Sequence, residues 1–214
     1  MSRYAGRTTR YRTTLAAPVA VVVALVMLPV PGQAQWGLEG RMQMGFGGDE
    51  LGTVEYSNGS SSALKLGTYF SFLAGPIFEA WRSGASSLEL QGMVGWSGWA
   101  TGPENTDDRL KLNRFPVEAL AFYGYRMPAR DMQLRIGGGV TYHLAGGVSG
   151  SGSLDGLDIG IDKALGGTGE VGLVYGILSM GLRYTHLSAT VEGLPASLDG
   201  SSIAIFGGLT TPRN

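Results

Sequence analysis

Apolar and polar residues alternate with a period of two along most of the chain after residue 34. The clearest example is 36–46, where Trp36, Leu38, Met42, Met44 and Phe46 share one face. The intervening positions hold Gly, Glu, Arg and Gln. This is the period of a β-strand with one apolar face. Because no segment after residue 34 shows sustained helical spacing, we predict an all-β fold.

Eight segments carry this alternation, separated by turn-rich sequence. In the fourth, the apolar phase changes near Arg114–Pro116, which predicts a β-bulge at that point. The eight segments are 36–46, 64–72, 88–96, 110–125, 132–142, 170–175, 180–185 and 203–209.

The connections between these segments differ systematically in length. Long loops on one rim and short turns on the other are typical of outer-membrane barrels. We therefore predict an eight-stranded antiparallel up-and-down transmembrane β-barrel in residues 35–214. The long connections are 47–62, 98–109, 145–166 and 189–200, the tight turns are 127–130 and 176–179, and only 75–86 breaks the rule.

Residues 1–34 have the features of an export signal. Four arginines and no acid precede the apolar run Leu15–Val30, and Gly32-Gln33-Ala34 supplies the small residues of a cleavage site. The apolar run is shorter than the roughly 20 residues that a membrane-spanning helix needs. We expect a signal peptide that is cleaved after Ala34.

The alternation alone would also suit a soluble lipocalin-like barrel, in which the apolar side chains face inward. Two features of the polar face favour a membrane barrel. It is rich in glycine, which leaves room in a narrow lumen for a few large side chains. Its charges also balance, and a basic residue on lipid would cost roughly 2–4 kcal/mol near the midplane. We predict that the lumen holds an ion-pair network of Glu39, Arg41, Lys65, Glu89, Glu118, Arg135, Glu170 and Arg183.

Aromatic residues gather near the ends of the predicted strands. Two such groups fit the two lipid–water interfaces, where amphipathic rings concentrate. Tyr184 also lies on an apolar face. We predict an aromatic girdle of Trp36, Tyr123 and Tyr175 at one rim and Phe46, Trp96, Trp99 and Tyr142 at the other, with Tyr184 in the seventh segment.

Composition excludes several classes of function. The chain has 16 Lys and Arg, four of them in the predicted signal, and 17 Asp and Glu, so the mature chain has a net charge of 12 − 17 = −5. A nucleic-acid partner is not expected, because phosphate binding needs a concentrated basic face. The absence of cysteine excludes disulfides, thiolate metal sites and a cysteine nucleophile. We expect no cofactor and no metal site.

The mature part resembles the eight-stranded outer-membrane barrels of the OmpA/OmpX-like porin superfamily. Gly181-Leu182-Arg183-Tyr184-Thr185 is typical of a late strand in these proteins. The resemblance implies a monomer in contact with outer-membrane lipid and lipopolysaccharide, inserted by the barrel-assembly machinery. Members usually finish on an aromatic residue, whereas the nearest aromatic residue to the end of this chain is Phe206.

His186 and Ser188 are the one candidate catalytic pair. They share the apolar face of the seventh segment, and His186-Leu187-Ser188 resembles the His-x-Ser of lipid A 3-O-deacylases. In such a pair the imidazole takes the hydroxyl proton and an acid orients the ring. This chain has Ala189 where that family has Asn, and the acid could be Asp199 or Glu192.

These observations predict a structural or adhesive protein of the cell envelope, with a filled polar lumen, mobile surface loops and no catalytic residues. A narrow or gated porin-like channel is the second alternative. A lipid A deacylase-like esterase that uses His186 and Ser188 is the third.

Overall fold

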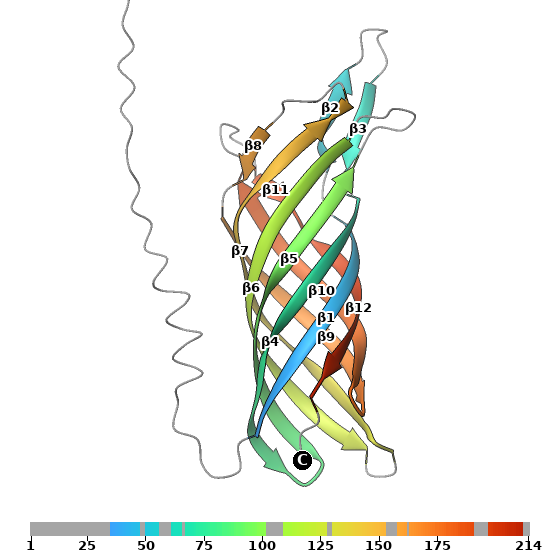
Figure 1. Ribbon diagram of the computed structural model, residues 1–214, viewed down its shortest axis with the longest axis vertical. Helices are drawn as coiled ribbons and strands as arrows, with labels where there is room; N and C mark the ends of the chain where they lie inside the picture. Colours follow the sequence, from blue (N-terminus) through green and yellow to red (C-terminus); the bar gives the residue numbers. More distant parts are fainter. Residues whose placement is uncertain are drawn as a thin grey trace, which may run out of the picture. The chain divides into compact units, whose positions relative to one another are not determined.

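The structure is a computed structural model that describes residues 35–47, 50–55, 61–65, 67–101, 109–127, 130–152, 158–161, 163–190 and 197–211. Eight long strands form a closed barrel in which every neighbouring pair is antiparallel (Figure 1). The predicted fold class is therefore confirmed. The barrel strands are β1 (Gln35–Gly47), β4 (Thr68–Ser83), β5 (Ser86–Thr101), β6 (Arg109–Met127), β7 (Met132–Ser151), β9 (Ala164–Tyr175), β10 (Leu178–Thr190) and β12 (Ser202–Thr210).

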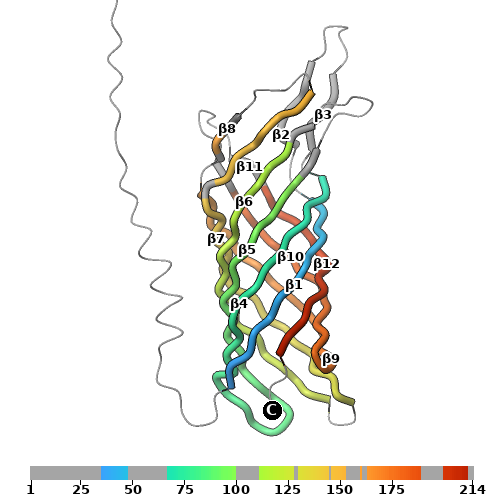
Figure 2. Tube along the Cα trace, viewed as in Figure 1, coloured from blue at the N-terminus to red at the C-terminus, as the bar shows by residue number. Residues whose placement is uncertain are grey.

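The ring closes where the first and the last barrel strands pair. Strand β1 pairs with β4 on one side and with β12 on the other, in a register that runs from Glu39↔Thr210 to Gly47↔Ser202. Figure 2 shows β1 and β12 running side by side along this seam. The order around the ring is β1, β4, β5, β6, β7, β9, β10 and β12.

Four shorter strands lie in the longer connections. Strands β2 (Glu50–Glu55) and β3 (Ser61–Lys65) pair with each other between β1 and β4. Strand β8 (Asp158–Ile161) pairs with the end of β7, and β11 (Ser197–Asp199) pairs with the end of β10. All of these connections leave the same end of the barrel, which we call the long-loop rim. The opposite end, where β1 begins, is the short-turn rim.

The short-turn rim is more regular than the sequence pattern predicted. The connection predicted at 75–86 is wrong, because β4 continues to Ser83 and joins β5 through Gly84 and Ala85 alone. Gly84 has a φ of +58° and Gly176, in the turn between β9 and β10, a φ of +57°. Glycine adopts this left-handed conformation without steric cost. The alternation of long and short connections therefore has no exception among the barrel strands.

Two register shifts occur between neighbouring strands of the barrel. In β4 the pairs Glu79↔Glu89 and Trp81↔Leu88 leave Ala80 as an extra residue, so that Trp81 turns outward directly after the inward Glu79. This is the local effect of a β-bulge.

The second shift lies close to the predicted bulge but has a different effect. The pairs Asn113↔Gly147 and Phe115↔Leu144 place the extra residue on β7 and leave β6 regular. The predicted change of phase in β6 is therefore wrong, because every second residue from Leu112 to Phe122 is buried.

Among the described residues, no helix is long and apolar enough to cross a membrane.

Candidate functional site: the outer face and the lumen

The outer face of the barrel is apolar. On β1 the outward residues between Trp36 and Phe46 include no charged side chain, and the same holds on β6 between Tyr125 and Phe115. All four of these aromatic residues are 44–51% exposed. Ten residues of a strand that rises ~3.3 Å per residue and tilts by ~40° span about 25 Å along the barrel axis, which is the height of the apolar band of a membrane barrel.

The exposed charged side chains of β6 lie near the ends of the strand. Lys111 and Arg126 are exposed, and they lie beyond the two aromatic residues that bound the apolar band of that strand. In water, a band of this size would be an unstable apolar surface. The polarity therefore fits a barrel whose outer face contacts acyl chains.

Seven of the eight predicted girdle residues face outward, and one does not. Trp99 is only 9% exposed and packs inside the barrel, 4.9 Å from the Tyr69 ring between centroids, so its assignment to the girdle is wrong. Tyr142 is half-buried, and Tyr184 is exposed in the middle of β10 rather than near its end. The remaining five are exposed near strand ends: Trp36, Phe46, Trp96, Tyr123 and Tyr175.

Trp81 is an outward aromatic residue at the short-turn rim that was not among the predicted girdle residues. It is 51% exposed, two residues before the end of β4. On the same rim, Tyr123 shares a hydrogen bond of 2.7 Å with Ser86. At the other end of the band, the Trp96 Nε1 donates to Asn113 Oδ1 at 3.2 Å. Rings with an apolar body and a hydrogen-bonded polar edge suit an interface.

The lumen contains a chain of ion pairs in which acids and bases alternate. Seven of the eight predicted residues form it, and each arginine bridges two glutamates. Their order is Glu89–Arg135–Glu39–Arg41–Glu170–Arg183–Glu118, and we call this set the ion-pair chain. Each of these seven residues is at most 5% exposed. Buried charges of this kind are stable only when they are paired and hydrogen-bonded.

Glu39 is the most heavily bonded member. It accepts hydrogen bonds from Arg41 at 3.0 Å, Arg135 at 3.0 Å and Ser179 at 2.9 Å. Gln91 bonds both Glu39 and Arg41. Its side-chain amide donates to Glu39 at 3.1 Å and accepts from Arg41 at 2.9 Å. Gln91 and Ser179 were not among the predicted residues, although their alternation parity places both on the inward face.

Lys65, the eighth predicted member, is not on a barrel strand. It ends β3, which pairs with β2 in a separate two-stranded sheet. Its side chain lies outside the described residues.

Glycines on the inward face make room for the largest lumen side chains. A Cβ at Gly181 would lie 2.7 Å from the Phe206 ring, and one at Gly172 would lie 3.2 Å from it. The Phe206 ring in turn lies 4.6 Å below the Arg41 guanidinium. Phe122 lies 5.4 Å from the Arg135 guanidinium in the same way. Two arginines of the ion-pair chain thus stack on aromatic rings for which glycines provide the space.

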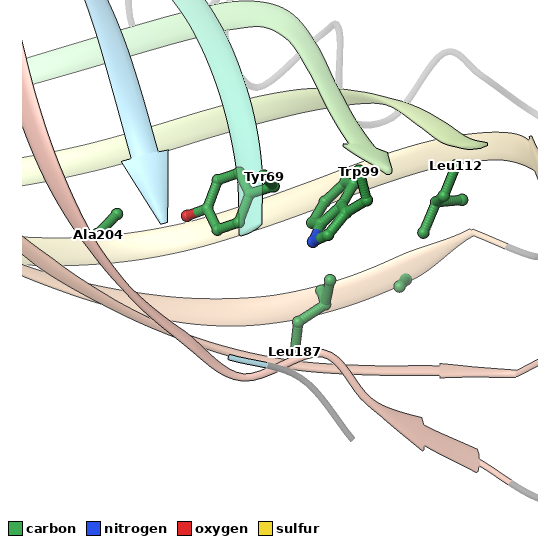
Figure 3. Close-up of a cluster of buried hydrophobic side chains, with 6 residues drawn as sticks. Tyr69, Trp99, Leu112, Leu187 and Ala204 are labelled. Atoms are coloured by element: carbon green, nitrogen blue, oxygen red, sulfur yellow. The ribbon is translucent and has the colours of Figure 1, made fainter. Parts of the chain in front are cut away.

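The sequence pattern predicted a lumen that is polar throughout, and the structure differs from this prediction at one end. Near the long-loop rim a cluster of apolar side chains fills it (Figure 3). Each member lies within five residues of the end of its strand at that rim. The cluster, which we call the apolar plug, consists of Tyr69, Trp99, Leu112, Ala164, Leu187 and Ala204, with Val148 packed against it.

The two residues of the predicted catalytic pair are not hydrogen-bonded to each other in the structure. His186 and Ser188 both face outward, but the His186 Nδ1 hydrogen-bonds the Ser201 Oγ, at 2.8 Å. The backbone of Ser188 pairs with that of Asp199, whose side chain lies outside the described residues, as does Glu192. His143, the other histidine, faces the lumen and is 6% exposed. No cluster of three potential metal ligands occurs in the described part of the chain.

An apolar outer band and a charged, closed interior define an eight-stranded barrel of the outer-membrane type. Solved structures of such barrels are similar to the chain in overall fold. Neisserial surface protein A has 14% identity and a TM-score of 0.45, over 83% of this chain and 97% of that one. OprG from Pseudomonas aeruginosa has 13% identity and a TM-score of 0.48, over 83% and 95%. AlkL in lipid bilayers has 16% identity and a TM-score of 0.41, over 86% and 93%.

These similarities concern the fold alone, and the assignment to a class rests on the chain's own polarity. No family model matches the sequence, and no curated protein matches it.

Proposed function

We propose that the chain is an integral outer-membrane barrel with a closed lumen, and that its role at the cell envelope is structural or adhesive. The observation that supports this most strongly is the double obstruction of the lumen. The ion-pair chain crosses the middle of the barrel, and the apolar plug fills it near the long-loop rim. Eight strands enclose an interior that side chains can just fill.

The predicted signal at residues 1–34 supports export, with cleavage after Ala34. In the outer membrane the apolar band would contact acyl chains, and the long-loop rim would face lipopolysaccharide. Insertion by the barrel-assembly machinery and a monomeric state belong to the same proposal. With the lumen closed, contacts with other molecules would be made by the long-loop rim, where the connections are longest.

Four experiments test this proposal. Envelope fractionation should place the protein in the outer membrane, and unheated protein should migrate differently from boiled protein in a gel. Recovery in the soluble periplasm would contradict the membrane assignment.

Purified barrel in planar bilayers should give no steady conductance steps. A deletion strain should lose surface attachment or resistance to detergent while its uptake of small solutes is unchanged. Steady conductance, or a deletion strain with intact attachment and resistance but impaired solute uptake, would instead support the porin-like alternative.

A further inference from the structure

Arg114 is a buried arginine that the ion-pair chain does not include. It points into the lumen from β6, is 4% exposed, and forms no salt bridge or hydrogen bond with any described residue. Its Cγ lies 3.0 Å from the position that a Cβ at Gly146 would occupy. The absence of a side chain at Gly146 therefore makes space for the arginine against β7.

The nearest acid along the inward face of β6 already pairs with another arginine. Glu118 lies four residues further along this strand and accepts hydrogen bonds from Arg183 on both carboxylate oxygens, at 2.8 Å on Oε2. Thr141 also donates to its Oε1, at 3.3 Å. Ser97 on β5 is the register partner of Arg114. Its hydroxyl donates to the hydroxyl of Ser71.

A second buried group with unused hydrogen-bonding capacity lies beside Arg114. His143 on β7 pairs with Pro116, the inward neighbour of Arg114 on β6. The histidine is 6% exposed, and its Nδ1 has no hydrogen-bond partner among the described residues. Arg114 and His143 thus form a cluster between the ion-pair chain and the apolar plug, since Leu112 of the plug is the next inward residue on β6.

We propose that Arg114 and His143 form a binding site for a small inorganic anion of the size of chloride inside the lumen. A buried guanidinium without a counter-charge is strongly destabilising, so an ion that pairs with it is favoured. Its N–H groups form a planar fork that suits an anion, and an imidazole N–H adds a further donor. The plug on one side and the ion-pair chain on the other limit the site to a small ligand.

Bromide tests the site directly, because it replaces chloride and scatters anomalously. Crystals of the full barrel grown in sodium bromide should show an anomalous peak in hydrogen-bonding contact with the Arg114 guanidinium. In solution, the temperature at which the folded gel band converts to the unfolded one should rise by a few degrees in sodium chloride, compared with sodium gluconate at equal ionic strength.

Arg114→Gln should abolish this difference between the salts. Arg126→Gln is the matched control, since Arg126 is an exposed arginine on the same strand, and it should preserve the difference. If the Arg114 variant does not fold, the bromide map of the natural sequence decides alone. The proposal would be overturned by a map without a peak at Arg114, by a carboxylate of this chain at that position, or by equal conversion temperatures in the two salts.

Discussion

Arg41 binds Glu170 across the lumen through both oxygens of the carboxylate. The Arg41 Nη1 lies 2.9 Å from Oε1 and 2.8 Å from Oε2. The two residues are 129 positions apart in the sequence, on β1 and β9, which are separated by β12 and β10 in the ring. This bond therefore connects two separate walls of the barrel, and it depends on the strands being closed.

Removal of the Glu170 charge should destabilise the barrel strongly. In Glu170→Gln, Arg41 and Arg183 both lose a partner in a buried site, which typically costs about 3–5 kcal/mol. Urea unfolding of the barrel in detergent measures this loss. Lys111→Gln, at an exposed position of β6, should change the stability by less than about 0.5 kcal/mol. Equal stability of the two variants would show that the ion-pair chain does not hold the walls together.

A methyl group at Gly181 should also be costly. The Cβ of Gly181→Ala would lie 2.7 Å from the Phe206 ring and even closer to the backbone oxygen of Val171. Overpacking of this kind costs about 1–3 kcal/mol. Gly207→Ala is the matched control, because no atom lies within 4 Å of the position of its Cβ. The same unfolding experiment compares the two variants, and a neutral Gly181→Ala would contradict the role of this glycine in the packing of the lumen.

Most of the barrel could be predicted from alternation, because each strand has one face on lipid and one in the lumen. The seven residues of the ion-pair chain could be found in the same way, since inward parity and charge together identify them. Trp99 also has inward parity, as do Glu89 and Gln91 on the same strand. Its aromatic ring suggests the girdle, whereas its parity indicates the lumen, and the structure follows the parity.

Other features could not be read from the sequence. The bulge at Ala80 breaks the alternation at the end of β4, so 75–83 looked like a connection and Trp81 was missed. The contact between His186 and Ser201 depends on how β10 meets the start of β12, which local sequence does not specify. The apolar plug likewise assembles residues from six strands.

The plug should contribute to stability without acting as the only barrier to ions. Trp99→Ala removes a ring that packs on Tyr69, and such a change typically costs about 3–5 kcal/mol. Because the ion-pair chain still crosses the lumen, we expect no conductance in planar bilayers from either this variant or the natural protein. Phe46→Ala, on the outer face, is the control. Stable conductance steps in Trp99→Ala alone would show that the plug is a gate.

Replacement of the hydroxyl that contacts His186 should leave lipid chemistry unchanged. Ser201→Ala removes the 2.8 Å hydrogen bond, and Ser188→Ala removes the serine of the predicted pair. The proposed function includes no catalysis, so the acylation pattern of lipid A should not depend on this protein. Mass spectrometry should show the same pattern in cells with the Ser201 variant, the Ser188 variant, the natural protein or no copy of the protein. Loss of a modification in the Ser201 variant alone would establish a catalytic role for Ser201 and His186.

The polarity of the wall can be measured on β7, because the chain contains no cysteine and single labels can be introduced. Spin labels at Ile136→Cys and Val140→Cys, both on the outer face, should be relaxed by oxygen dissolved in the bilayer but not by a water-soluble nickel reagent. A label at the inward Thr141→Cys should be shielded from both, and one at the exposed Arg130→Cys should respond to nickel. If nickel relaxes the labels at 136 and 140 as strongly as the label at 130, the apolar face does not lie in lipid and the membrane-barrel account is wrong.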